Sequence, residues 1–168
     1  MTLSPLAPDS FPDLPTIAGI KLGTAASGMR YQGRDDLLLI RLAPGSSVAG
    51  VFTQSDTAAA PVGWSRKIAK TGTAAALITN AGNANAFTGS HGDDAVHEMV
   101  NHLASHLNCD PGTIMVASTG VIGEPLDAAK LLPYFDRLVT QSNASWHDAA
   151  NAILTTATFA KGAHATGM

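Results

Sequence analysis

The sequence predicts an α/β or α+β protein, a layered sheet covered by helices, because strand-like and helix-like segments alternate along the chain. Short apolar runs that end in turn residues are typical of buried strands, and longer segments with apolar residues every three or four positions are typical of helices. Both kinds of segment occur in turn between residues 37 and 155. Elements that alternate in this way form a sheet with helices packed on its faces.

Four short runs have the character of strands. Residues 37–42 are mostly apolar and are closed by a Pro-Gly turn, which indicates a buried strand. Residues 48–53 are a second candidate, and these two could pair as a hairpin. Residues 74–79 and 113–116 are the other candidates, and each stops in a segment of small or polar residues.

Three segments are predicted to be helical. After an acidic first turn, one apolar face is formed at three- and four-residue spacing by Val96, Met99, Val100, Leu103 and Leu107. Residues 126–139 are a second helix, which Pro133 would break or kink. Ser145, with Asp148 three residues later, is a helix N-cap, and the third helix runs from there towards residue 155.

Length and composition suit one domain. The chain has 168 residues, of which 45% are apolar, so a sizeable core can form. Residues 1–16 hold four prolines, which lack a backbone N–H and fix φ. We therefore expect an irregular arm over residues 1–16 and a single α/β domain over residues 17–168.

Charge and hydropathy argue against several classes of function. The formal net charge is −3, and no basic cluster is interleaved with aromatic residues, which argues against nucleic-acid binding. The longest apolar runs are too short to cross a bilayer, and residues 1–16 lack the basic start and apolar stretch of a secretion signal. The single cysteine, Cys109, rules out an internal disulfide. We expect a soluble cytoplasmic protein without membrane or nucleic-acid partners.

The segment after residue 116 suits an oxyanion hole. Ser118, Thr119 and Gly120 follow the apolar run, and a helix-like segment opens shortly afterwards. A strand that ends in Thr-Gly presents a hydroxyl and an unhindered backbone N–H at one point, and acyl transfer needs such donors where negative charge develops. An ordinary strand-to-helix turn uses the same residue types, so the residues alone leave both interpretations open.

Three asparagines follow the strand candidate at residues 74–79, in a loop of small residues. Asn80, Asn83 and Asn85 could provide ordinary turn chemistry, since Asn tolerates positive φ and bonds nearby backbone. Their amides could equally brace the backbone of a neighbouring acyl-transfer site, and the residues alone do not separate the two roles.

No metal or cofactor site is predicted. His97 and His102 nearly match a zinc-binding HExxH motif, but they lie five residues apart, about 140° round a helix. His102 and His106 are four residues apart, yet no further ligand is placed nearby in sequence to complete a site. Cys109 has no base partner marked in the sequence, and the glycines form neither a phosphate loop nor a dinucleotide fingerprint.

Several unusual strings occur in one order along the chain. They are GVFTQ at residues 50–54, AAPV at 59–62, ITNAGNANA at 78–86, STGVIGEPL at 118–126 and AILTT at 152–156. In this order and at these distances the set resembles the ornithine acetyltransferase family, the bifunctional glutamate N-acetyltransferases of arginine biosynthesis. The resemblance runs from about Gly19 to Thr158. It is to the α chain, the N-terminal half of a precursor that cuts itself in two.

The resemblance implies half of a self-processed acyltransferase with an N-terminal nucleophile. In this family a threonine freed by self-cleavage begins a separate β chain and carries the acetyl group from N-acetylornithine to glutamate. That cycle needs no acetyl-CoA and no other cofactor. The family's oxyanion hole falls here on Thr119 and Gly120, with Asn80, Asn83 and Asn85 as supporting residues. An α2β2 assembly is implied.

The substrate-binding segment departs from the family pattern at one position. The family's TTDT segment falls on residues 155–158. The resemblance implies that a threonine of this segment binds substrate, which leaves Thr155, Thr156 and Thr158 as candidates, with Thr155 as first choice. Ala157 stands where the family has aspartate. This replacement removes a charge that could orient the neighbouring hydroxyls.

The C-terminal residues depart further. Residues 161–168 echo the family's lysine-bearing KGSGM segment only loosely, and the nucleophilic threonine and the β chain are not in the sequence. We therefore expect the isolated chain to be inactive. It could be a natural α half that waits for a partner, a truncated half or a fragment.

Two other classes of function remain open. A stand-alone domain could keep the scaffold and bind a small acylated amino acid or a partner chain without catalysis. Half of an amidohydrolase of similar fold would use water in place of glutamate as the acceptor. A partner chain that begins with threonine would favour the acetyltransferase over both.

Overall fold

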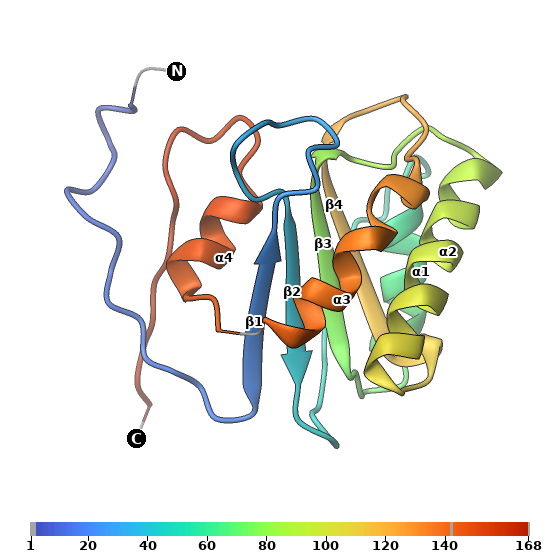
Figure 1. The fold of residues 1–168 in the computed structure, drawn as a ribbon, viewed down its shortest axis with the longest axis horizontal. Helices are drawn as coiled ribbons and strands as arrows, with labels where there is room; N and C mark the ends of the chain where they lie inside the picture. Colours follow the sequence, from blue (N-terminus) through green and yellow to red (C-terminus); the bar gives the residue numbers. More distant parts are fainter. Residues whose placement is uncertain (1–2, 142, 168) are drawn as a thin grey trace.

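The computed structural model describes residues 3–141 and 143–167 and contains one four-stranded mixed sheet (Figure 1). The strands lie in the order β1-β2-β3-β4; β1 pairs antiparallel with β2, β2 antiparallel with β3, and β3 parallel with β4. Their bounds are β1 Ile20–Ala25, β2 Leu37–Leu42, β3 Ala76–Asn83 and β4 Ile114–Val121. The mixed α/β class expected from the sequence is confirmed.

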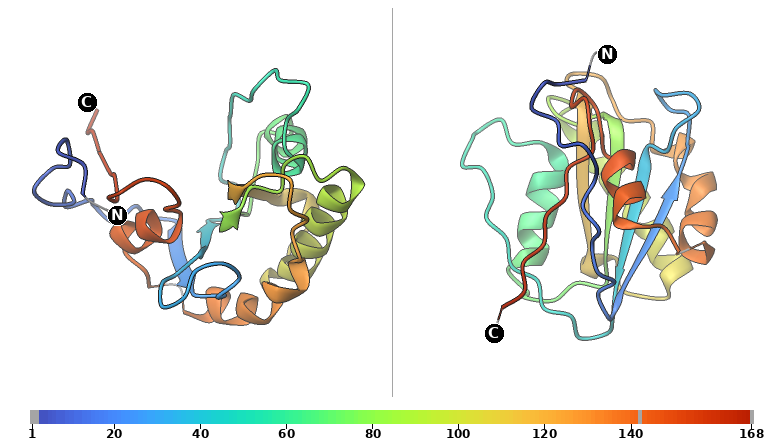
Figure 2. Two further views of the ribbon diagram at one scale, coloured as in Figure 1. Left: turned by 90° about the horizontal axis from the view of Figure 1, so that it is seen from above. Right: turned by 90° about the vertical axis from the view of Figure 1, so that its left-hand side faces the viewer.

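Helices cover both faces of this sheet and the outer side of β4 (Figures 1 and 2). The α-helices are α1 Ala60–Ala69, α2 Ser90–Leu107, α3 Phe135–Thr140 and α4 Trp146–Ala152, and short 3-10 helices span Pro111–Thr113, Ala128–Lys130 and Leu132–Tyr134. Helices α2 and α3 enclose the larger core, whereas α4 packs against β1 and β2 on the opposite face. Within the described residues, no helix is long and apolar enough to cross a membrane.

The predicted hairpin is wrong. Residues 48–53 form no strand: an isolated bridge between Ser47 and Thr73 anchors the start of this loop, and Val51 is 99% exposed. Without a face to bury, this apolar run gains nothing from joining the sheet. The strand that pairs with β2 in place of residues 48–53 is β1. Its sequence was not predicted to be a strand, because lysine, glycine and threonine interrupt its apolar residues.

The single helix predicted over residues 126–139 is also wrong. Two 3-10 turns come first, and α3 begins only at Phe135, after Pro133. Proline lacks an N–H and clashes with the preceding turn, so it lies near the start of the helix, not within it. Helix α1 was missed, although Pro61 at its first turn is a common start signal.

The two other helix predictions are confirmed. Helix α2 buries Val96, Met99, Val100 and Leu103 on one face, as their spacing predicts. Helix α4 begins with a reciprocal capping box: the Asp148 N–H donates to Ser145 Oγ at 3.1 Å, and the Ser145 N–H donates to Asp148 Oδ2 at 2.8 Å. The helix ends at Ala152, earlier than the expected run towards residue 155.

Among the described residues, no helix packs on the β3–β4 half of one sheet face. Side chains alternate along a strand, and Leu77 of β3 and Met115 and Ala117 of β4 point away from the α2 side. They lie only half-buried, because α4 packs on the β1–β2 half of that face (Figure 2, left). An apolar surface therefore extends over β3 and β4 on the part of this face that α4 does not cover.

Candidate functional site

The Thr-Gly pair lies within β4, not beyond it. The strand does not stop at residue 116 as expected, because β3 extends to Asn83 and keeps pairing with it: Ala81 pairs with Thr119 and Gly82 with Gly120. Gly120 has φ +137°, and a Cβ there would lie 2.2 Å from the Gly82 carbonyl carbon. Only glycine allows the two strands to approach in this way.

A bulge in β3 at Gly82 and Asn83 shapes the same end of the sheet. The fully buried Asn80 spans it: its Nδ2 donates to the Asn83 carbonyl at 2.9 Å, and its Oδ1 accepts from Ser118 Oγ at 2.6 Å. One side chain therefore connects the bulge to the residue before Thr119.

Two further asparagines fix the chain on either side of the bulge. Asn83 Nδ2 donates to the Glu124 carbonyl at 2.9 Å, and Asn83 Oδ1 accepts from the Asn85 N–H at 2.7 Å. Asn85 has φ +46° and reaches α2, where its Nδ2 donates to the Gly92 carbonyl at 2.9 Å. The three amides brace backbone from both strand ends and from the start of α2.

Side chains of helix α1 form hydrogen bonds with the backbone at the outer edge of β4 as far as residue 116. Trp64 Nε1 donates to the Ile114 carbonyl at 2.8 Å, and Ser65 Oγ both donates to the Val116 carbonyl at 2.7 Å and accepts from the Val116 N–H at 2.9 Å. Backbone groups alternate along a strand, so the Gly120 N–H is directed to this same outer edge. It lies four residues beyond the last of these bonds.

The Thr119 side chain occupies the open half of the sheet face. It alternates with Ser118, which points to the buried asparagine, and it therefore shares a side with Met115 and Ala117. The side chain is only half-buried. Thr119 and Gly120 are both half-buried at this end of β4. A hydroxyl and a backbone N–H are the kinds of donor that an oxyanion hole needs.

The threonine segment at residues 155–158 lies at the other side of the same sheet end. It follows α4, and the carbonyl of Leu154, the residue just before it, accepts a hydrogen bond from Arg34 Nη2. The Thr158 hydroxyl accepts from the Ser4 N–H at 3.1 Å, so the N-terminal arm already uses it. Thr155 is half-buried and Thr156 exposed.

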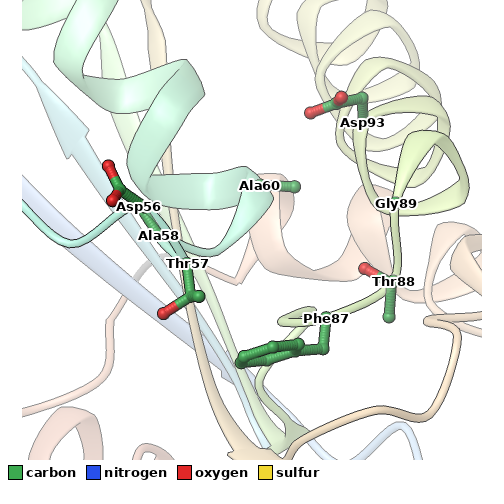
Figure 3. Close-up of a pocket in the computed structure, with 8 residues that line it drawn as sticks. All are labelled: Asp56, Thr57, Ala58, Ala60, Phe87, Thr88, Gly89 and Asp93. Atoms are coloured by element: carbon green, nitrogen blue, oxygen red, sulfur yellow. The ribbon is translucent and has the colours of Figure 1, made fainter.

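A cavity that the sequence does not predict lies between the segment before α1 and the turn into α2 (Figure 3). It measures about 350 Å³ and is open to solvent. Its lining residues come from the segment before α1 and from the turn into α2: Asp56, Thr57, Ala58, Ala60, Phe87, Thr88, Gly89 and Asp93. The Thr88 hydroxyl donates to Asn85 Oδ1 at 2.9 Å, so the cavity shares a wall with the asparagine network.

The histidines of α2 contact different neighbours. The His97 ring packs edge-on against Trp64, with 4.9 Å between centroids, while His102 Nε2 lies 3.3 Å from His106 Nε2. Asp136, from α3, lies 3.9 Å from His106 Nδ1. The part of the chain that the structure describes brings together no three side chains placed to hold a metal ion.

The model of the ArgJ family matches residues 21–168. The chain belongs to the ArgJ family. The arginine biosynthesis bifunctional protein ArgJ of Nitrobacter winogradskyi is 50% identical over 164 residues, which cover 95% of this chain and 39% of the relative. The ArgJ protein of Bradyrhizobium diazoefficiens is 48% identical over 166 residues, covering 98% of this chain and 40% of the relative.

Two solved structures of ArgJ proteins share the fold. The ornithine acetyltransferase of Mycobacterium tuberculosis, complexed with ornithine, aligns with a TM-score of 0.77 and 34% identity over 83% of this chain and 77% of that chain. The ArgJ protein of Bacillus halodurans aligns with a TM-score of 0.75 and 32% identity over 84% of this chain and 74% of that chain. The present chain spans about 40% of the length of the curated ArgJ relatives that it matches, at their N-terminal part.

Proposed function

We propose that this chain is the α part of a cytoplasmic acetyltransferase that moves the acetyl group of N-acetylornithine to glutamate. A separate β chain with an N-terminal threonine would supply the nucleophile, and the assembly would be α2β2. Membership of the ArgJ family supports the reaction, and the ornithine-bound relative supports the substrate class. The observation that carries the proposal is the corner formed by Thr119 and Gly120 at the end of β4.

The role proposed for this corner is to hold the oxyanion in both halves of the reaction. The partner's threonine hydroxyl attacks the acetyl carbonyl of N-acetylornithine, its proton passes to the threonine α-amine, and the carbonyl electrons move onto oxygen. The Thr119 hydroxyl and the Gly120 N–H each donate to that oxygen. Collapse breaks the C–N bond, and ornithine leaves with the proton. The glutamate amine then attacks the carbonyl of the acetyl ester and forms a second oxyanion, held by the same donors. Its collapse breaks the C–O bond of the ester, so that N-acetylglutamate leaves and the proton of the attacking amine returns through the α-amine to the threonine oxygen.

The asparagine network would keep the two donors in place. An oxyanion hole works only when its donors are fixed before charge develops, because moving them during the reaction would cost free energy. Asn80 and Asn83 tie the bulge of β3 to β4 and to the segment after it. Asn85 ties the same backbone to α2. These contacts support the assignment of all three as structural residues of the site.

The threonine segment would bind the acylated amino acid. Within the described residues, the Thr155 and Thr156 hydroxyls make no hydrogen bond, whereas the Thr158 hydroxyl accepts one from the Ser4 N–H. Thr155 therefore remains the first choice for a substrate contact. Ala157 leaves the segment without the charge that the family places there, which would weaken substrate orientation.

The open half of the sheet face is where the β chain would pack. Leu77, Met115 and Ala117 form a half-buried apolar surface beside Thr119. Covering such a surface removes apolar area from water and gains about 25 cal/mol per Å². A partner chain on this surface would also bring its N-terminal threonine next to the proposed oxyanion hole.

Acetyl transfer measured with and without a partner chain tests the function. The chain alone should transfer no acetyl group, whereas the chain co-expressed with a partner that begins with threonine should acetylate glutamate from N-acetylornithine. Glutamate and water compared as acceptors separate this reaction from an amidohydrolase. Release of acetate at the same rate with and without glutamate would contradict the proposal.

A further inference from the structure

We propose that Arg34 is a positioning residue that sets the geometry of the substrate-binding threonine segment, an inference that rests on the proposed function. Arg34 lies in the loop of residues 26–36 between β1 and β2, at the same end of the sheet as Thr119 (Figure 1). This loop contacts both parts of the proposed site.

One side of the loop contacts the backbone next to Thr119 and Gly120, at the bulge of β3 and after the end of β4. The Cβ position of Gly82 lies 2.9 Å from Arg30 Cβ, so the loop packs directly against the bulge of β3. Arg30 Nη1 also pairs with Glu124 Oε2 at 3.2 Å, in the segment that follows β4. Both partners of this ion pair are about half-exposed, so its contribution to stability is small.

The other side of the loop holds the threonine segment. Arg34 Nη2 donates to the Leu154 carbonyl, and its guanidinium carbon lies 4.1 Å from the centroid of the Tyr31 ring. Stacking on the ring restricts the guanidinium, so the hydrogen bond is made by a side chain that is already oriented.

The bond to Leu154 determines the direction of the next residue. The Leu154 carbonyl and the Thr155 N–H belong to one planar peptide unit, so fixing the first fixes the second. Before that unit, the Leu154 N–H bonds the Asn151 carbonyl at 3.2 Å, which ties it to the end of α4. Thr155 therefore begins from a backbone held on one side by α4 and on the other by Arg34.

The base of the loop is rigid enough to transmit this constraint. Asp36 is 1% exposed, and its Oδ1 accepts from the Ser27 N–H at 2.6 Å, which closes the loop across its two ends. The Ala81 N–H donates to the Asp36 carbonyl at 2.8 Å and joins this closure to β3 beside Thr119. Hydrogen bonds of this loop thus connect the threonine segment to the part of β3 that pairs with Thr119 and Gly120.

Arg34→Met in the assembled enzyme tests the proposal, with Arg30→Met as the matched control. Arg34 Nε is buried and lacks a partner within the described residues, so Met removes an unsatisfied donor and should leave the fold intact. Losing the hydrogen bond from a charged donor should raise the KM for N-acetylornithine about tenfold, with kcat nearly unchanged. Arg30→Met should change KM by less than about twofold.

Amide hydrogen exchange on the same variants separates this inference from the proposed reaction. Exchange of the Leu154 amide, which donates to the Asn151 carbonyl at 3.2 Å, should become about tenfold faster in Arg34→Met and stay unchanged in Arg30→Met. Unchanged exchange at Leu154 would overturn the positioning role whether or not the assembly transfers acetyl groups. Faster exchange with an unchanged KM in an active enzyme would overturn the link to substrate. An inactive wild-type assembly would contradict the proposed function, while exchange would still test Arg34.

Discussion

At the scale of single residues, the end of β4 depends on glycine at position 120, where no side chain fits. The Thr-Gly pair stands out in the sequence because its chemistry is local. The close approach of Gly120 to Gly82 cannot be seen in the sequence. It arises from the register between β3 and β4, which pairs two residues that lie 38 positions apart in the chain. The amides of Asn80, Asn83 and Asn85 were predicted to bond nearby backbone, and they do, but the partners Gly92 and Glu124 depend on the fold.

Gly120→Ala should destabilise the protein, and Gly63→Ala should not. At Gly120 the new methyl group would overlap the Gly82 backbone at a positive φ, and we expect a loss of about 2–3 kcal/mol in the free energy of unfolding. Gly63 lies inside α1 with nothing within 4 Å of its Cβ position, so alanine there should gain about 0.5–1 kcal/mol. Urea unfolding of both variants measures the difference; equal effects would contradict the close approach.

At the scale of elements, the sequence predicted those whose signals lie within themselves. Helix α2 has a complete apolar stripe, and α4 has its capping pair at Ser145 and Asp148. Strand β1 and helix α1 were missed because tertiary contacts define them: β1 is a strand through its pairing with β2, and α1 is held by its bonds to the outer edge of β4. The prediction of a strand over residues 48–53 was wrong, because apolar residues alone do not make a strand.

Ser65→Ala should show how much the edge of β4 depends on α1. Ser65 is only 4% exposed. Its hydroxyl donates to the Val116 carbonyl and accepts from the Val116 N–H. Its removal leaves two backbone groups without a partner, at a cost of about 2–3 kcal/mol. Ser105→Ala, which removes an exposed hydroxyl bonded within α2, is the control and should cost less than about 0.5 kcal/mol. Thermal unfolding of the two variants compares them; similar losses would show that the edge does not need Ser65.

The start of α4 should make stability depend on acidic pH. Hydrogen bonds from the Ser145 hydroxyl and N–H lower the pKa of Asp148 from its ordinary value of 3.8. A group whose pKa is lower in the folded state contributes stability above its unfolded pKa and loses it as pH falls through the folded value. Asp148→Asn should therefore be less stable than wild type at pH 7, with the gap narrowing below about pH 4. Urea unfolding across this range measures it; a gap that is constant with pH would contradict the cause.

At the scale of the whole molecule, the described residues leave half of one sheet face without a helix. Helix α4 covers the β1–β2 half, and the β3–β4 half remains half-exposed beside Thr119. The chain matches the N-terminal part of its longer relatives and covers 39% of the Nitrobacter winogradskyi protein. Sequence patterns do not show which half of a face stays open, because this depends on where a helix packs after folding.

The isolated chain should associate through this face. Half-exposed apolar surface favours self-association in water, so we expect dimers or larger species. Met115→Lys should shift the chain towards monomer, whereas Met99→Leu, a volume-conserving change in the α2 core, should not alter association. Light scattering after size exclusion at several concentrations reports the species present. A monodisperse wild-type monomer would contradict the open-face account.

The central claim is that the Thr119 hydroxyl donates to an oxyanion, and kcat for acetyl transfer in the assembled enzyme tests it most directly. Thr119→Val keeps the shape and removes the donor, so kcat should fall about 10²–10³-fold, while Thr119→Ser keeps the hydroxyl and should retain most of the activity. Circular dichroism establishes that each variant is folded. Wild-type turnover in folded Thr119→Val would contradict the account; a large fall in Thr119→Val with activity restored by serine is the result it predicts.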